Sequence, residues 1–248
     1  MAMRIPSQAE LVEMWERGSG QPSFERALIV LSVCSDESRE QLAQMSIGQR
    51  DGRLLEVYRG LFGSFLDAFA ECPACTEPLE YRLAAGTLVS AEERGEKTLM
   101  LETSDARVEL RAPNSFDLEA IDDFRDLSEA RNLLLERCVV SASLGGTRVS
   151  TDKLPAPLVE QIDAKLAEAD QQAEMMISLE CSACGHAWQV LLDIERFLWA
   201  KISALAKRLL SEVHVLASAY GWTETDVLSL GSARRQLYLD MVGSWTAS

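Results

Sequence analysis

Residues 69–83, FAECPACTEPLEYRL, and residues 177–192, ISLECSACGHAWQVLL, share one pattern, in which a C-x-x-C pair lies between two apolar stretches. The alternation of apolar and polar residues predicts strands on both sides of each pair, at 64–71, 78–83, 175–180 and 187–192. Two strand–turn–strand units that face each other form a zinc ribbon, in which thiolates surround a tetrahedral zinc ion. The sequence therefore predicts one structural zinc site, with the ligands Cys72, Cys75, Cys181 and Cys184.

Three other uses of the cysteine pairs are weighed against structural zinc. Thioredoxin-like redox chemistry places a C-x-x-C pair at a helix N-terminus, whereas both pairs here precede strands. A catalytic zinc keeps one coordination position open, and four cysteines close the shell. Two pairs without metal are the third alternative. Structural zinc is preferred because C-x-x-C pairs in a reducing compartment are metal or redox motifs rather than disulfides.

The long separation of the two pairs decides the domain organisation. Between Cys75 and Cys181 lie 105 residues, far more than the ~15–20 of a compact ribbon. The cost of closing a loop grows only logarithmically with its length, so zinc can still join the two turns. The inserted segment must then fold by itself, with its two ends close together.

The insertion is expected to hold both strands and helices. Alternating residues at 98–104 and 106–113 predict a β-hairpin. Helices are expected from Asn114 or Ser115, over 127–140 and over 158–170, with a loop at Gly145 and Gly146. The fold class is therefore α+β: a discontinuous zinc ribbon of four cysteine ligands with a long insertion, N-terminal helices and a C-terminal helical module. The expected divisions are 1–63, 64–83 with 175–192, 84–174, and 193–248.

The flanking regions are expected to be helical. Ser7 with Glu10 forms a capping box, and helices are predicted through residue 17, over 23–33 with Ser23 as cap, over 37–44, and over 50–62 before Gly63. The longest helix is predicted over 193–219 and carries an apolar stripe. These apolar positions are Ile194, Phe197, Leu198, Ile202, Leu205, Leu209, Val213, Leu216 and Tyr220. The stripe packs either on the chain's own helices or on a partner protein.

Two short helices are expected to close the chain, with Thr223 and Ser232 as caps. They resemble a helix-turn-helix superficially. Arg234 and Arg235 at the start of the last helix oppose its dipole, which suggests that they meet an acidic group. A DNA-reading helix needs more basic support than this chain offers.

The charge balance narrows the function classes. The chain has 24 basic and 39 acidic residues, for a net charge of -15, and such a field repels nucleic acids and anionic membranes. A basic face of a protein is a compatible partner. No apolar run approaches ~18 residues, and the first residues lack the apolar core of a secretory signal, so the expected location is the cytoplasm.

The remaining cysteines and the two histidines suggest no further site. Cys34 and Cys138 lie among apolar residues and are expected to be buried. His186 directly follows Cys184-Gly185 and is expected to point away from the metal, and His214 is expected to pack within the long helix. With no nucleophile motif, no phosphate-binding glycine loop and no helical H-E-x-x-H, the chain is not expected to be an enzyme.

Several segments carry a resemblance to a known family. They are IGQRDGRLLEVYRGLFG (47–63), LRAPNSFDLEAI (110–121), LLLERCVVSA (133–142) and the whole of 181–242. Their combination resembles zinc-ribbon proteins encoded beside the tail genes of contractile-tailed phages and phage-tail-like contractile injection systems, which are similar to baseplate hub assembly chaperones. The resemblance covers most of 47–243, and its most specific parts are the paired turns and the segment from Trp199 to Met241. The family carries glycine after both cysteine pairs, and Thr76 departs from this pattern.

The resemblance implies a non-enzymatic assembly factor or minor structural component of a contractile baseplate. Its partners would be tail or baseplate proteins, and it would be cytoplasmic or associated with the particle. A zinc-ribbon transcriptional regulator that binds DNA is the alternative, and a metal-dependent hydrolase is a third hypothesis. The coordination shell separates the last from the others, because a hydrolase needs a water in place of one thiolate.

Overall fold

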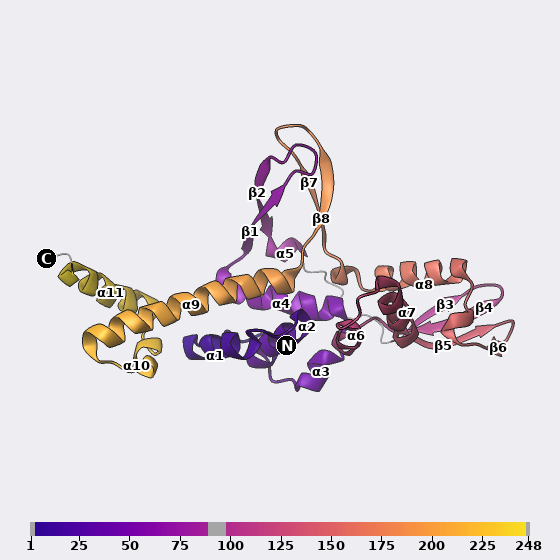
Figure 1. The fold of residues 1–248 in the computed structure, drawn as a ribbon. Coiled ribbons are helices and arrows are strands. Elements are labelled where there is room, and N and C mark those ends of the chain that lie inside the picture. The colour runs from indigo at the N-terminus through magenta and orange to yellow at the C-terminus, as the bar shows by residue number, and fades with distance from the viewer. Residues whose placement is uncertain (1–2, 89–97, 247–248) are drawn as a thin grey trace. The chain divides into compact units, whose positions relative to one another are not determined.

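The computed structural model describes residues 3–88 and 98–246 (Figure 1). The chain divides into two compact units. The central unit comprises residues 37–194, and the terminal unit joins the residues up to 36 with those from 195 onward. The mixture of helices and small antiparallel sheets confirms the α+β class. The division into four parts predicted from the sequence stays a prediction.

Two hairpins of the central unit carry the cysteine pairs, as the alternating pattern predicts. They consist of β1 (Phe65–Glu71) with β2 (Pro78–Ala84) and β7 (Met176–Glu180) with β8 (Ala187–Leu191). Both are antiparallel and two-stranded. The strand pair next to the turn is Glu71 opposite Pro78 in the first hairpin and Glu180 opposite Ala187 in the second. A two-stranded hairpin is only marginally stable alone, so both depend on contacts beyond their own ladders.

Helix α4 (Ile47–Phe62) precedes the first hairpin, between α3 (Arg39–Ala43) and β1. It begins three residues earlier than expected, because Ser46 and Gln49 form a capping box that the sequence analysis missed. Gly63 ends it with φ 96°, a conformation that favours glycine. The Tyr58 hydroxyl then donates to the carbonyl of Phe65 at 2.9 Å and fixes the start of β1 against the helix.

The insertion contains a four-stranded antiparallel sheet in the order β3-β4-β5-β6. The predicted hairpin is confirmed as β3 (Leu99–Glu102) and β4 (Ala106–Leu110). Strands β5 (Val139–Leu144) and β6 (Thr147–Arg148) were not predicted. The predicted helix over 127–140 ends at Cys138, and the β-branched pair Val139-Val140 starts β5, which pairs with β4. Part of the insertion, residues 89–97, lies outside the described residues.

The insertion has its own hydrophobic core. Its helices are α6 (Ser115–Ile121), α7 (Leu127–Cys138) and α8 (Ala156–Ala169), with short 3-10 turns at Thr151–Lys153 and Gln171–Ala173. Leu158 and Ile162 of α8 pack with Val108, Leu110 and Ala142 of the sheet. Burying a leucine or isoleucine is worth ~1.5–3 kcal/mol, so this core contributes to the stability of the insertion.

The two ends of the insertion lie together, as the zinc prediction requires. The Gln172 side chain, in the turn after α8, donates to the carbonyl of Leu88 at 3.0 Å, and Leu88 ends the short helix α5 (Ala85–Leu88). Both segments contact α4. Asp170 also accepts hydrogen bonds from the Ser46 hydroxyl (2.9 Å) and the Gly48 amide (3.0 Å). Its negative charge therefore interacts favourably with the positive end of the α4 dipole.

The buried carboxylate of Asp51, on α4, is expected to make stability depend on pH. Burial raises the pKa of Asp51 to about 6; Arg50 opposes the rise, whereas Asp193 and Asp170 add to it. Because this pKa exceeds the ordinary value, the folded state binds more protons, and the free energy of unfolding falls as pH increases through 6. Between pH 5 and 7.5 the Asp51 contribution should fall by about 1–1.5 kcal/mol.

Urea unfolding of the wild type and of Asp51→Asn at several pH values in that range measures this contribution. The difference between the two proteins isolates Asp51 from all other titrating groups. Parallel pH dependences for the two proteins would show that Asp51 ionises freely in the folded state.

The terminal unit consists of helices. They are α1 (Gln8–Gly18), α2 (Ser23–Cys34), α9 (Ile194–Tyr220), α10 (Glu224–Leu228) and α11 (Ser232–Thr246). The Ser7–Glu10 and Thr223–Asp226 capping boxes are present. Ser23 and Ser232 are first helical residues rather than caps, and α11, with 15 residues, is longer than expected. Among the described residues, no helix combines the length and apolarity needed to cross a bilayer.

The apolar stripe of α9 is largely buried within the chain. Leu198, Ile202, Leu209 and Leu216 are at most 2% exposed, which favours packing on the chain's own helices over docking. On the same helix, Trp199 lies so close to α1 that a Cβ added to Gly18 would be 2.2 Å from its ring. The terminal unit is thus closed by contacts between its two distant chain segments.

The two arginines at the start of α11 have different environments, because Arg235 is buried and Arg234 is not. Arg235 is 3% exposed and pairs with Glu212 of α9 at 2.5 Å, which confirms that it meets an acidic group. It also donates to Gln8 of α1. Arg234 is exposed. Arg235 is therefore part of the packing and is not available to read DNA.

Candidate metal centre

The two cysteine turns have the same backbone hydrogen bonds. In the first turn, the amide of Cys72 donates to Glu77 (3.0 Å), and the amide of Thr76 donates to Cys72 (2.8 Å). In the second, Cys181 donates to His186 (2.9 Å) and Gly185 to Cys181 (2.8 Å). Each turn therefore holds its two sulfurs on one side, as the C-x-x-C spacing predicts.

The four predicted ligands come together. Their sulfur atoms lie within 4.8 Å of one another, with Cys72 to Cys184 at 3.7 Å and Cys75 to Cys181 at 3.6 Å. A tetrahedral zinc with Zn–S bonds of about 2.3 Å requires sulfurs about 3.8 Å apart. The cluster therefore fits a metal ion of this size and preference, held by two residues from each hairpin. Cys72 and Cys181 are buried, and Cys75 and Cys184 are exposed.

Neighbouring thiols of the cluster compete for ionisation, so that the pKa values of Cys72 and Cys75 shift in opposite directions. Burial opposes ionisation of Cys72, but hydrogen bonds from the amides of Ala74 and Cys75 and from neighbouring thiols lower its pKa to about 7. The amide of Glu77 favours the Cys75 thiolate, yet the other cysteines and burial together raise its pKa to about 12. A cation removes this competition, because it stabilises all four thiolates at once.

Thr76 is the weak point of the first turn. It has φ 61°, where the second turn has Gly185 at φ 73°, and a side chain in this region is strained. Thr76→Gly should raise the free energy of unfolding by ~0.5–1 kcal/mol. Gly185→Ala should lower it by a similar amount, because a Cβ there has nothing within 4 Å and adds only backbone strain.

Thermal unfolding of both variants at saturating zinc tests this pair of effects. Opposite shifts of the midpoint are expected. Shifts of the same sign would mean that the left-handed conformation does not limit the stability of the turns.

The other cysteines and the histidines lie elsewhere. Cys34 and Cys138 are buried, as predicted, and burial raises the pKa of each to about 11. His186 is exposed and stacks on Trp188, with ring centres 6.0 Å apart. His214 is exposed, so its predicted role in packing is wrong. Among the described residues, the four cysteines are the one group that could hold a metal ion.

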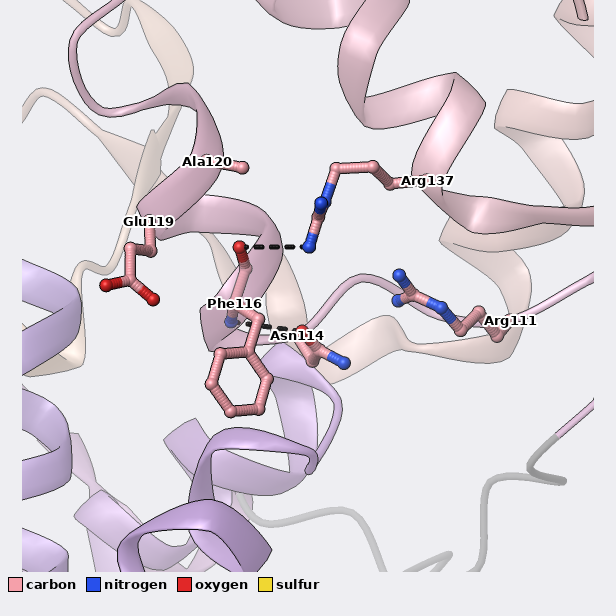
Figure 2. A pocket seen from close by; sticks show the side chains of 6 residues that line it. All are labelled: Arg111, Asn114, Phe116, Glu119, Ala120 and Arg137. Atoms are coloured by element: carbon pink, nitrogen blue, oxygen red, sulfur yellow. Dashed lines mark hydrogen bonds between the residues drawn. The ribbon is translucent and has the colours of Figure 1, made fainter.

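A second polar cluster lies in the insertion and was missed as a unit. Asp117 is buried and accepts hydrogen bonds from Arg111 (2.6 and 2.8 Å) and Arg137 (2.7 Å). The two arginines line a hollow of about 460 Å³ beside Phe116 (Figure 2). Arg137 also donates to the carbonyl of Phe116. This cluster joins α6, α7 and the end of β4, which is a structural role.

Comparison with known proteins places the chain in a family. The family model described as T4 bacteriophage base plate protein matches residues 25–199, which include both cysteine turns and the whole insertion. No curated protein matches the chain, and neither does any solved structure. The segment from Trp199 to Met241, one of the two most specific parts of the resemblance in the sequence, lies beyond this match except for its first residue.

Proposed function

The chain belongs to the T4 bacteriophage base plate protein family, and we propose that it is a non-enzymatic assembly factor or minor component of a contractile, phage tail-like baseplate. The family indicates a structural or assembly role in a phage baseplate. The observation that carries the proposal is the extent of the match, since it covers 25–199 without leaving out the cysteine turns or the insertion. Its partners are then other tail or baseplate proteins.

Zinc is proposed as the resident metal, with Cys72, Cys75, Cys181 and Cys184 as its ligands. The support is the sulfur spacing, the soft donor set and the matched turns. Bound zinc would hold the two hairpins together and fix the base of the insertion. A shell of four thiolates leaves no position for a reacting water, so the metal's role in this proposal is structural.

The DNA-binding alternative gains no support from the observations. The last helix begins with one arginine in an internal ion pair, and the net charge of -15 opposes a polyanion. A protein-docking role agrees better with the acidic surface.

Affinity capture of the tagged chain from its native host tests the proposal. Free and particle-bound fractions are separated by sedimentation, and their proteins are identified by mass spectrometry. Tail or baseplate proteins are expected in at least one fraction. Capture without any tail protein, together with normal particles from a strain that lacks the chain, would refute the baseplate role.

A further inference from the structure

A groove of about 770 Å³ lies in the insertion, between α7 on one side and the start of α8 on the other. Its apolar lining includes Phe124, Leu133, Leu135, Leu154 and Val159. Phe124 is 40% exposed. Such a hollow accommodates apolar side chains of another molecule, as binding clefts commonly do.

Helix α7 is only partly covered by the chain itself. Of its 12 residues, Cys138 is the buried one. Leu127 is 85% exposed, and Leu133 and Leu135 are half-buried although they face the groove. Leu133, Leu134 and Leu135 are each half-buried, and Leu135 packs on the core of the insertion. The apolar surface left for another molecule is therefore that of Leu127, Leu133 and Phe124, and exposed apolar surface of this kind marks interaction sites.

The rim of the groove is acidic. Glu129, Glu136, Asp152 and Glu160 line it and are exposed, and none of the four forms an ion pair within the described part of the chain. The one basic lining residue, Arg131, is paired with Asp163 of α8. The surrounding segment 119–136 has six acidic and two basic residues. A cationic ligand is therefore favoured over a neutral or anionic one.

We propose that this groove binds a cationic amphipathic helix of a partner protein, with apolar side chains on α7 and basic side chains against the rim. The inference rests on the proposed docking function and adds the site and the chemistry of the partner. Apolar anchors rimmed by complementary charge are the usual design of a helix-in-groove interface.

Fluorescence anisotropy with a labelled probe tests the site in the full-length protein. The probe is a designed helix of about 18 residues, with leucine at positions i, i+3, i+4 and i+7 and lysine elsewhere. A matched peptide carries glutamate in place of lysine. At low salt, where exposed charges are least screened, the lysine peptide should bind and the glutamate peptide should not.

Matched variants separate the groove from the general field of the protein. Glu129→Lys with Glu160→Lys should weaken binding of the lysine peptide roughly tenfold, which is about 1.4 kcal/mol. Glu13→Lys with Glu16→Lys changes the net charge equally on an exposed part of α1, and should change affinity by less than about twofold. Phe124→Ala, which keeps every charge, should weaken binding several-fold.

Equal losses in both charge variants, no loss in Phe124→Ala, equal binding of the two peptides, or no binding by the wild type would each overturn the groove proposal. If the groove fails while capture still recovers tail proteins, the baseplate function stands and the partner docks elsewhere. If capture also fails, the proposed function is wrong as well.

Discussion

Replacing Cys181 with serine is expected to unfold or aggregate the protein and to reduce its zinc content from about one ion per chain to nearly none. Cys181 is 1% exposed, and its sulfur lies 3.6 Å from the sulfur of Cys75. The substitution therefore removes a buried candidate ligand at the junction of the two hairpins. Structural zinc contributes ~10–16 kcal/mol in small zinc domains, which is as large as the whole stability of an ordinary protein. Two marginal hairpins cannot replace it.

Cys34→Ser is the matched control for this experiment. Cys34 is equally buried, but it lies in α2 and outside the cluster. The control should keep its zinc and lose only ~1 kcal/mol, the common cost of a single substitution. Zinc content by mass spectrometry and far-UV circular dichroism are the measurements. A soluble, folded Cys181→Ser protein without zinc would contradict the role of the metal as a clamp.

Asp117→Asn is expected to destabilise the central unit by ~2–3 kcal/mol. The carboxylate is fully buried between Arg111 and Arg137, which are 29% and 35% exposed at their side chains. An amide of the same size removes the charge and leaves two guanidinium groups facing each other. The estimate lies below the 3–5 kcal/mol of a fully buried pair, because water still reaches both arginines.

The effect of Asp117 should also depend on pH. Burial acts to raise its pKa, but hydrogen bonds from Arg111, the Asn114 amide and Arg137 outweigh burial and lower the pKa below its usual range. The folded state therefore binds fewer protons than the unfolded one. The stabilisation is present above the unfolded pKa and is lost as pH falls through the folded pKa.

Urea unfolding of Asp117→Asn at neutral pH measures the loss, with Glu119→Gln as control. Glu119 is on the same helix and is exposed (Figure 2), and its substitution should change the free energy of unfolding by less than ~0.5 kcal/mol. Equal free energies of unfolding for the two variants would show that the Asp117 cluster does not stabilise the folded state.

The cluster of four cysteines could be predicted from the sequence because each pair and its flanking strands depend on neighbouring residues. Each C-x-x-C turn is determined by a few neighbouring residues, and the strands on either side follow from alternation. Bringing the two cysteine pairs together also brings the ends of the insertion together, where the Gln172 side chain donates to the carbonyl of Leu88. Thr76 could be identified as the strained position because a single conformation is required there.

Other features depend on distant partners and could not be predicted. Val139–Leu144 follow a helix directly, and although Val139 and Val140 favour a strand, the sequence does not show that β4 offers the edge with which they pair. The position of Arg235 at the start of a helix predicts an acidic neighbour, but nothing in the sequence identifies that neighbour as Glu212 or shows that Gln8 also accepts from Arg235. Nor does the sequence indicate that the first helices join the last ones in one unit. The Asn114–Asp117 capping box could have been found from its spacing, but the arginines that share Asp117 lie 6 and 20 residues away from it.

X-ray absorption at the zinc edge of the purified protein tests the central claim most directly. It determines both the metal and its ligands without any substitution. The account predicts one zinc per chain with four sulfur ligands at about 2.3 Å. A protein purified under reducing conditions that holds no zinc, or a shell with nitrogen or oxygen in place of a sulfur, would contradict it.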